Sequence, residues 1–186
     1  MRWFRRSTID PLAVTMPGVK LGDRLLVVGC SDPGLIAALA VKTGLTGRAC
    51  AVDADAGLRT AAAAQVQRQG ALVETFTVPW TDLPFERDSF DVVVLRSVLP
   101  GLDSNSRVRV AQETHRLLRG GGRCLVIDPA PRGGLGALLK RQAESDYASA
   151  GGAVRPLEAA GFRGVRVLAE REGSTFVEGV KSADSG

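Results

Sequence analysis

Hydrophobic residues recur along this chain in two alternating patterns. Short, continuous apolar runs are typical of strands buried on both faces, and the segments between them carry apolar residues at helical spacing. The runs that predict strands are Arg24 to Gly29, Arg48 to Val52, Ala71 to Val78, Phe90 to Leu95 and Arg123 to Ile127. The segments that predict helices are Asp32 to Gly44, Asp55 to Gln69 and Asn105 to Leu118. Strands that alternate with helices indicate an α/β fold with a parallel sheet.

Residues with known preferences for helix ends support these boundaries. Asp32 is a favoured N-cap and Pro33 a favoured first helical residue, whereas Gly44 and Gly70 are favoured stops. The three glycines at 120–122 predict the end of the third helix, directly before the fifth strand.

The last third of the chain predicts a different connection. After a Gly- and Pro-rich stretch, we expect helices around Ala137 to Ala148 and at Val154 to Ala160. Two apolar runs follow, Gly164 to Leu168 and Ser174 to Val180, with only a few polar residues between them. A connection this short forces antiparallel pairing. We therefore expect a hairpin whose last strand lies between the fifth and sixth strands of a seven-stranded sheet.

Length and composition fit one soluble domain. The chain has 186 residues, 45% hydrophobic and 24% charged, which excludes disordered, collagen-like and coiled-coil proteins. We expect a single domain over residues 1–186, with residues 1–18 as an N-terminal extension. The longest apolar run without glycine, Leu35 to Val41, is far shorter than the ~20 residues that span a bilayer. A cytoplasmic location is the expectation.

Charge and cysteine usage narrow the function classes further. The net charge is +4, and the basic residues are mostly scattered along the chain rather than clustered. A nucleic-acid partner is therefore not expected. The first six residues mix arginines with Trp3 and Phe4, a combination that suggests a peripheral membrane contact. Cys30, Cys50 and Cys124 lie far apart without metal-ligand spacing, so no metal site is expected and the thiols should be reduced and mostly buried.

Four segments in a fixed order point to a family. They are LLVVGCSDPG at Leu25 to Gly34, AVD at Ala51 to Asp53, LPF and SFD at Leu83 to Phe85 and Ser89 to Asp91, and ETHRLLRGGG at Glu113 to Gly122. Together they resemble the class I S-adenosylmethionine-dependent methyltransferases, in the small-molecule subgroup that includes the quinone-biosynthesis enzymes. The resemblance spans about Val19 to Lys181. It implies a Rossmann-like, doubly wound sheet of order 3-2-1-4-5-7-6 with the last-numbered strand antiparallel.

The resemblance also implies the cofactor, S-adenosylmethionine, and a set of residues around it. The residues that we expect to bind the cofactor are Gly29, Cys30, Ser31, Gly34, Asp53, Ala54, Trp80 and Arg96. Gly29 and Gly34 leave room for a nucleoside to approach the backbone, and the helix start at Asp32 offers N–H groups to a carboxylate.

Asp53 directly follows a buried strand and can accept two hydrogen bonds from ribose hydroxyls, although an aspartate there can also cap the next turn. Asp55 is instead expected to be a helix N-cap. We therefore expect Asp53→Ala to weaken cofactor binding with little loss of stability, and Asp55→Ala to do the reverse.

Three positions depart from the family pattern. Val27 replaces a carboxylate, Ser31 replaces the middle glycine, and Pro79 stands where an aspartate usually accepts from the adenine amino group. Trp80 can stack on adenine or simply close the edge of a pocket. Fewer hydrogen bonds to the cofactor predict weaker binding unless other groups compensate, for which Asp32 and Asp55 are candidates.

No catalytic residue is predicted, because methyl transfer from a sulfonium to a nucleophilic acceptor can proceed by alignment and desolvation alone. His115, the only histidine, is expected to be structural rather than a general base. Asp128, at the end of the fifth strand, is a better acidic candidate for acceptor chemistry, or it caps the turn at Pro129.

The expected function is methyl transfer to a small-molecule or lipid-like acceptor. The alternative is a domain of the same fold that has lost catalysis and serves as a binding or partner module. A nicotinamide-dependent enzyme is a third reading, which the terminal hairpin and the absence of a GxGxxG motif disfavour. The sequence leaves the oligomeric state open.

Overall fold

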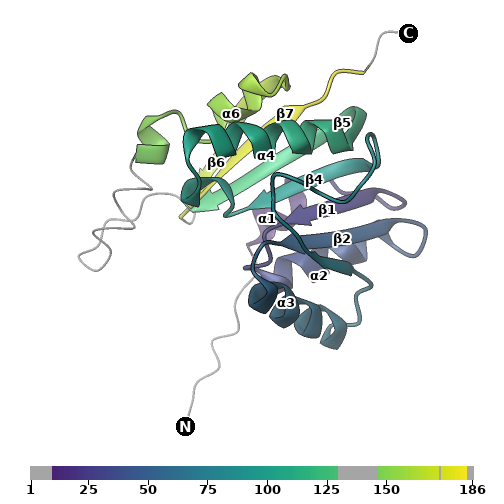
Figure 1. The fold of residues 1–186 in the computed structure, drawn as a ribbon. Helices are drawn as coiled ribbons and strands as arrows, with labels where there is room; N and C mark the ends of the chain where they lie inside the picture. The colour runs from purple at the N-terminus through teal and green to yellow at the C-terminus, as the bar shows by residue number, and fades with distance from the viewer. Residues whose placement is uncertain (1–9, 130–145, 172, 184–186) are drawn as a thin grey trace.

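The chain folds around a single sheet of seven strands (Figure 1). The computed structural model describes residues 10–129, 146–171 and 173–183. The strands are β1 (Arg24–Val28), β2 (Arg48–Asp53), β3 (Glu74–Thr77), β4 (Phe90–Arg96), β5 (Leu118–Pro129), β6 (Arg163–Arg171) and β7 (Ser174–Val180). Their order across the sheet is β3-β2-β1-β4-β5-β7-β6. The first five strands pair in parallel, and β7 is antiparallel to both β5 and β6. The predicted fold class, strand order and terminal hairpin are confirmed.

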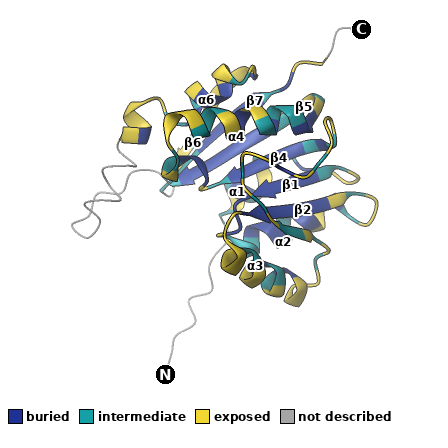
Figure 2. Ribbon diagram, viewed as in Figure 1, coloured by how far each residue is buried: buried dark blue, intermediate teal, exposed yellow. Residues whose placement is uncertain are grey.

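Helices cover both faces of this sheet. They are α1 (Pro11–Thr15), α2 (Pro33–Thr43), α3 (Ala56–Arg68), α4 (Ser104–Leu117) and α6 (Val154–Ala159), with a 3₁₀ turn, η1 (Leu99–Gly101), after β4. The buried side chains of α4 and α6 join one core, and those of α1, α2 and α3 join the other. Figure 2 shows the strands buried between these layers, with exposed residues on the outer sides of the helices.

Side-chain alternation along the strands explains the two cores. In β1, Leu26 and Val28 face the α4 side, whereas Leu25 and Val27 face the α2 side. Because both faces are covered, the strand reads as a continuous apolar run. Val27, which stands where the family has a carboxylate, is only 1% exposed and completes the α2-side core.

One predicted strand is shorter than expected, and one predicted helix lies mostly outside the described residues. The third strand is shorter than Ala71 to Val78, because β3 is an edge strand that pairs only along Cys50 to Asp53 of β2. Of the helix expected around Ala137 to Ala148, the part up to residue 145 lies outside the described residues, and residues 146–149 are helical.

The glycines at 120–122 do not end α4. Leu118 is already extended and pairs with Phe90, so the helix ends at Leu117 and the glycines belong to the irregular start of β5. Gly121 donates to the carbonyl of Lys181 and Lys181 donates to that of Gly122, both at 2.9 Å. These bonds to the chain after β7 hold the glycines in the sheet.

Several motif residues clamp the fold together. Asp91 accepts hydrogen bonds from the backbone and side chain of Arg24, at 2.8 and 3.1 Å, and from Arg119. Burial opposes ionisation of this carboxyl group, but these hydrogen bonds outweigh it and lower its pKa to about 2. Asp91 thereby ties the start of β1 to β4 and β5.

A second clamp joins α4 to the loop after β3. Glu113 accepts from the backbone N–H of Leu83 at 3.0 Å, and Arg116 donates to the carbonyls of Leu83 and Phe85 at 3.2 and 2.9 Å. Glu113 and Arg116 also pair with each other at 2.6 Å. Two of the four family-like segments therefore hold each other, and they fix the loop that carries Trp80.

The N-terminal extension is part of the packed structure from residue 10 onward. Asp10 caps α1, and Ala13 is buried against the α2-side core. Residues 1–6, where a membrane contact was suggested, lie outside the described residues. In the described part of the chain, no helix has the length and apolar character to cross a membrane. All three cysteines are buried, as predicted.

Candidate functional site

An open cavity of about 170 Å³ lies at the carboxyl edge of the sheet, beyond the ends of β1, β2 and β4. Its lining consists of Gly29, Ser31, Asp53, Ala54, Asp55, Leu58, Trp80, Arg96 and Ser97. We call it the Gly29 cavity. Ligands of open α/β sheets bind at this edge, where the strand order reverses about β1 and β4.

Gly29 sits where β1 leaves the sheet, and its position requires glycine. Its φ is +95°, and its N–H donates to the carbonyl of Val52 at 2.9 Å. A Cβ here would collide with the carbonyl oxygen of Arg96 on β4. The close approach of these two backbones forms the floor of the cavity.

Asp53 is the best-held acidic group of the site. It is 2% exposed, and its two carboxylate oxygens accept from the backbone N–H groups of Cys30 at 2.6 Å and Asp55 at 2.9 Å. A carboxylate has about four acceptor positions, so two remain for a ligand. The carboxylate therefore ties two loops together as well as lining the cavity. These two hydrogen bonds revise the expectation for Asp53→Ala: removal of the carboxylate should also lower stability, because two backbone donors would lose their partner.

The start of α3 forms the opposite wall. Asp55 is the N-cap, as predicted, and accepts from the backbone N–H of Leu58 at 2.9 Å. Leu58 is 45% exposed and lines the cavity. Its place in the first turn of the helix, at the sheet edge, puts it beyond the layer that covers the strands.

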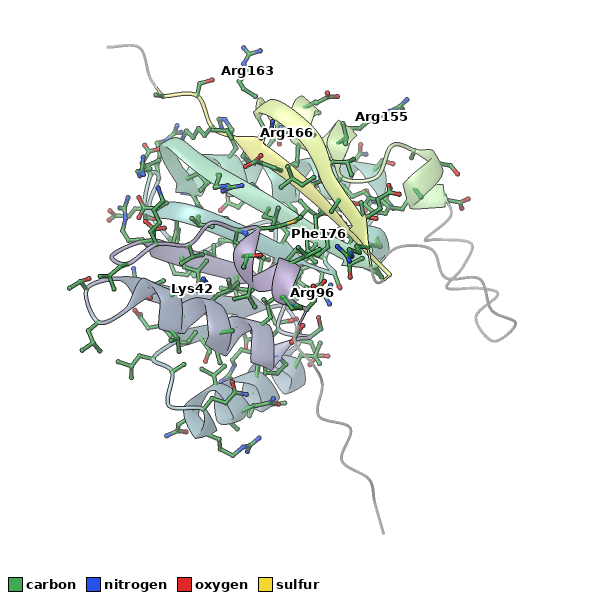
Figure 3. The ribbon with its side chains drawn as sticks, turned by 180° about the vertical axis from the view of Figure 1, so that it is seen from behind. Lys42, Arg96, Arg155, Arg163, Arg166 and Phe176 are labelled. Carbon is green, nitrogen blue, oxygen red and sulfur yellow. The ribbon has the colours of Figure 1, made fainter. Side chains whose placement is uncertain are left out.

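The end of β4 supplies the basic group. The Arg96 side chain is labelled in Figure 3, which views the molecule from behind relative to Figure 1. The Arg96 guanidinium donates to the carbonyl of Ile127 at 3.3 Å and lies 3.8 Å from the carboxylate of Asp32, the N-cap of α2. Its Nε is buried without a hydrogen-bond partner among the described residues. The next residue, Ser97, has a φ of +56°, an uncommon backbone conformation for a residue other than glycine.

Trp80 closes the cavity on the side of the loop after β3. Its ring packs against the α4-side core. Its Nε1 is buried, and no described residue accepts a hydrogen bond from it. A buried donor without a partner is costly and calls for an explanation, such as a ligand acceptor.

The structure gathers most of the predicted cofactor residues around this one cavity. Two predicted residues do not line it: the N–H of Cys30 is used by Asp53, and Gly34 lies in the first turn of α2. Sequence reasoning missed Leu58 and Ser97, whereas Asp55, expected as an N-cap and as a candidate compensating group, both caps α3 and lines the cavity. One signal for Leu58 was available in the sequence: it is an apolar residue three positions after Asp55, an N-cap that closely follows the end of a strand.

The two other titratable candidates lie elsewhere. His115 is near the end of α4, which leads directly into the start of β5, so it belongs to the opposite edge of the sheet. Its ring contacts that of Phe162 edge to face at 5.0 Å. Asp128, at the end of β5, shares the carboxyl edge with the Gly29 cavity but lines a separate cavity.

An open α/β sheet with such a cavity defines a Rossmann-like cofactor-binding domain. Residues 26–126 match the family described as methyltransferase domain, and this span is more than half of the chain. The chain belongs to this family, and its cofactor is S-adenosylmethionine. No curated protein matches the chain.

Solved structures share the fold at low sequence identity. A methyltransferase of Aquifex aeolicus, described as dependent on S-adenosylmethionine, is 20% identical with a TM-score of 0.73, over 92% of this chain and 93% of that one. A putative methyltransferase of Bacillus halodurans is 15% identical with a TM-score of 0.68, over 92% and 97%. A putative O-methyltransferase of Nostoc punctiforme is 18% identical with a TM-score of 0.70, over 91% and 55%. The chain thus spans about half the length of this last protein.

The residues of the Gly29 cavity fit part of this cofactor. Asp53 has free acceptor positions, and Trp80 Nε1 and Arg96 Nε are buried donors without partners among the described residues. The cavity volume, about 170 Å³, is below the roughly 300–1,000 Å³ of typical ligand pockets. Ser31, Ala54 and Asp55 are exposed, so a ligand larger than the cavity extends past them toward solvent.

Proposed function

We propose that this chain transfers a methyl group from S-adenosylmethionine to a small-molecule or lipid-like acceptor. The observation that carries the proposal is the buried Asp53 carboxylate, held by two backbone N–H groups at the carboxyl edge of the sheet, in a chain of the methyltransferase domain family. The motif residues favour the small-molecule subgroup that includes the quinone-biosynthesis methyltransferases.

Each wall of the Gly29 cavity has a role in this proposal. Asp53 would accept from the ribose hydroxyls, because a carboxylate with two free acceptor positions suits a pair of adjacent hydroxyls. Arg96 and the start of α2 would bind the carboxylate of the methionine part. Trp80 and Leu58 would flank the adenine. Their apolar contacts would take the place of the aspartate that is missing at Pro79. Bound S-adenosylmethionine supplies an electrophilic methyl group.

The departures from the family pattern predict weaker binding rather than none. Val27 removes one carboxylate from the cofactor side, and a lost hydrogen bond of this kind costs roughly 0.5–3 kcal/mol. The buried donors of Trp80 and Arg96 offset part of this cost if they find acceptors on the cofactor.

Tryptophan fluorescence gives a direct test. The sequence has two tryptophans, so Trp3→Phe leaves Trp80 as the sole indole reporter. We expect S-adenosylmethionine and its demethylated product to change the Trp80 emission with saturation, and NAD to leave it unchanged. Absence of saturable binding by calorimetry and fluorescence would overturn the proposal.

Turnover separates the enzyme from a binding module of the same fold. Release of the demethylated product is measured with panels of phenols, amines and carboxylic acids as acceptors. Acceptor-dependent release supports the enzyme. Tight binding without release on any panel would instead favour the binding module.

A further inference from the structure

A second cavity, of about 280 Å³, lies where β5 ends and β7 begins. Its lining includes Asp128 and Pro129 of β5, Tyr147, Glu170 of β6, and Thr175 and Val177 of β7. We call it the Asp128 cavity. Most of the lining is apolar or glycine, which suits the body of an apolar ligand.

The polar centre of this cavity is a buried pair. Asp128 is 4% exposed and Tyr147 is 6% exposed, and the Tyr147 hydroxyl donates to Asp128 Oδ2 at 2.6 Å. The other oxygen, Asp128 Oδ1, is buried and has no hydrogen-bond partner among the described residues. Asp128 therefore does more than cap a turn, because a buried acceptor without a partner destabilises the fold unless something binds to it.

Burial brings the pKa of Asp128 close to neutrality. Burial raises its pKa to about 7, against the Tyr147 hydrogen bond and the charges of Arg96 on β4 and Arg107 on α4, which lower it. Arg107 stacks over the Tyr147 ring at 4.6 Å, and burial, together with Asp128, raises the pKa of Tyr147 so that it stays a donor. Glu170 on β6 is exposed at the cavity, and the Cys124 thiol on β5 stays neutral because burial raises its pKa.

The two cavities are neighbours at one edge of the sheet. Arg96 lines the Gly29 cavity, pairs in register with Ile127, and donates to the carbonyl of that residue. Asp128 is the next residue along β5. A ligand in the Asp128 cavity therefore lies one strand away from the cofactor residues.

The lining selects the chemistry of that ligand. Among the described residues, it contains two carboxyl groups, Asp128 inside and Glu170 at the exposed side, and no lysine or arginine. These carboxyl groups disfavour an anionic ligand, and the charges of Arg96 and Arg107 offset only part of this effect. One free carboxylate oxygen matches a single O–H donor, whereas an ammonium group would require three acceptors.

We propose that Asp128 is the catalytic base for O-methylation of a neutral acceptor with a phenol-like hydroxyl on an apolar body, and that Tyr147 positions it. This inference rests on the proposed function. The acceptor O–H proton passes to Asp128 Oδ1, and the oxygen lone pair forms a bond to the methyl carbon. The carbon–sulfur bond breaks, and its electron pair returns to the sulfonium, which leaves as a neutral thioether. Asp128 ends as the neutral acid and loses its proton to solvent.

The test uses the full chain with three matched naphthalenes: 2-naphthol, 2-naphthoic acid and 2-aminonaphthalene. We expect wild-type protein to methylate 2-naphthol in preference to the other two, with a rate that rises with pH through about 7. Asp128→Asn should lower kcat at least about 100-fold while cofactor affinity by calorimetry stays within about twofold.

Tyr147→Phe distinguishes positioning from mere packing. Loss of the Tyr147 hydroxyl removes a hydrogen bond that lowers the Asp128 pKa, so the pH midpoint of the rate should move upward. The kcat should fall about tenfold. Glu158→Gln, which removes an exposed carboxylate on α6, is the control and should keep the wild-type rate and pH profile.

The outcomes separate this inference from the proposed function. Cofactor binding without methylation of 2-naphthol, a preference for the acid or the amine, or an unchanged rate in Asp128→Asn would overturn the inference alone. Absence of cofactor binding in the wild-type protein would overturn the proposed function and the catalytic step together. A direct titration with 2-naphthol then still measures whether Asp128→Asn weakens ligand binding.

Discussion

At the scale of single residues, Asp53 joins two roles that are often separate. Its carboxylate accepts from two backbone N–H groups and also lines the Gly29 cavity. The same geometry that fixes its orientation for a ligand makes it part of the fold. Measurements of binding and of stability therefore have to be made on the same variants.

We predict that Asp53→Ala loses both properties. S-adenosylmethionine affinity should fall about ten- to hundredfold through lost charge-assisted hydrogen bonds, and stability should fall by about 1–3 kcal/mol because the Cys30 N–H is left buried without a partner. Asp55→Ala is the comparison and should cost about 0.5–2 kcal/mol of stability through the lost N-cap, with little effect on binding. Calorimetric titrations and thermal melts measure both. Equal binding losses in the two variants would show that Asp53 is not the ribose ligand.

His115 provides a second residue-scale prediction, on stability and pH. Burial, and then the charges of Lys181 and Arg87, lower the pKa of His115 below its ordinary value. As pH falls below about 6.5, the unfolded chain takes up this proton before the folded chain does. The contribution of His115 to stability is therefore present at higher pH and is lost as pH falls from about 6.5 through the lower folded pKa.

His115→Gln should lack this contribution and lose less stability than wild type between pH 7.5 and pH 5.5 in denaturant titrations. Since the residue lies away from both cavities, methyl transfer and cofactor affinity should stay within about threefold. A hundredfold loss of rate at unchanged binding would contradict the structural role and identify a general base.

At the scale of elements, the loop after β3 depends on α4 for its position. Glu113 and Arg116 hold Leu83 and Phe85, and the same loop presents Trp80 to the Gly29 cavity. A change on the helix should therefore reach the cavity through this loop.

We predict that Glu113→Ala lowers the free energy of unfolding by about 1–3 kcal/mol, because a backbone donor and a guanidinium lose a partner. Cofactor affinity should fall as well, by less than tenfold, because Trp80 is held less firmly. Gln112→Ala, a neighbouring substitution on the exposed side of α4, should change neither quantity. An affinity unchanged by Glu113→Ala, with the expected loss of stability, would show that the clamp does not position Trp80.

The same scale shows what sequence could and could not predict. The hairpin of β6 and β7 was predictable, since a connection this short allows only antiparallel pairing. The glycines at 120–122 were misread because their partners, Gly121 with Lys181 and Lys181 with Gly122, are distant in sequence. Leu58 was missed as a cavity residue because helical spacing identifies an apolar face of a helix but not where the layer covered by that face ends. The end of the second strand identified Asp53, and the family resemblance supplied Arg96. The partner of Asp128, Tyr147, becomes visible only in three dimensions.

At the scale of the whole molecule, cofactor binding should be measurable as stability. A ligand that binds only the folded state at one hundred times its Kd adds about 2.7 kcal/mol. For a chain of this length, about 2–4 °C of Tm corresponds to each kcal/mol, so S-adenosylmethionine should raise the Tm by roughly 5–11 °C. NAD at the same concentration is the control, and a shift with NAD alone would point to a nicotinamide-dependent protein.

The clamps described above also bear on how such chains diverge. Asp91, Glu113, Arg116 and the Leu83–Phe85 loop are much of what makes this sequence resemble its family, and their contacts maintain architecture rather than chemistry. Natural selection for a stable fold is enough to retain them, even in a descendant that acquires a new acceptor or abandons transfer. Side chains that contribute little to the stability of the fold, such as the exposed Ser31 and Leu58, can be substituted once the cofactor is no longer needed. Among descendants of one ancestor, the residues that line the cavity therefore indicate whether activity is retained. The recognisable motifs indicate only common ancestry.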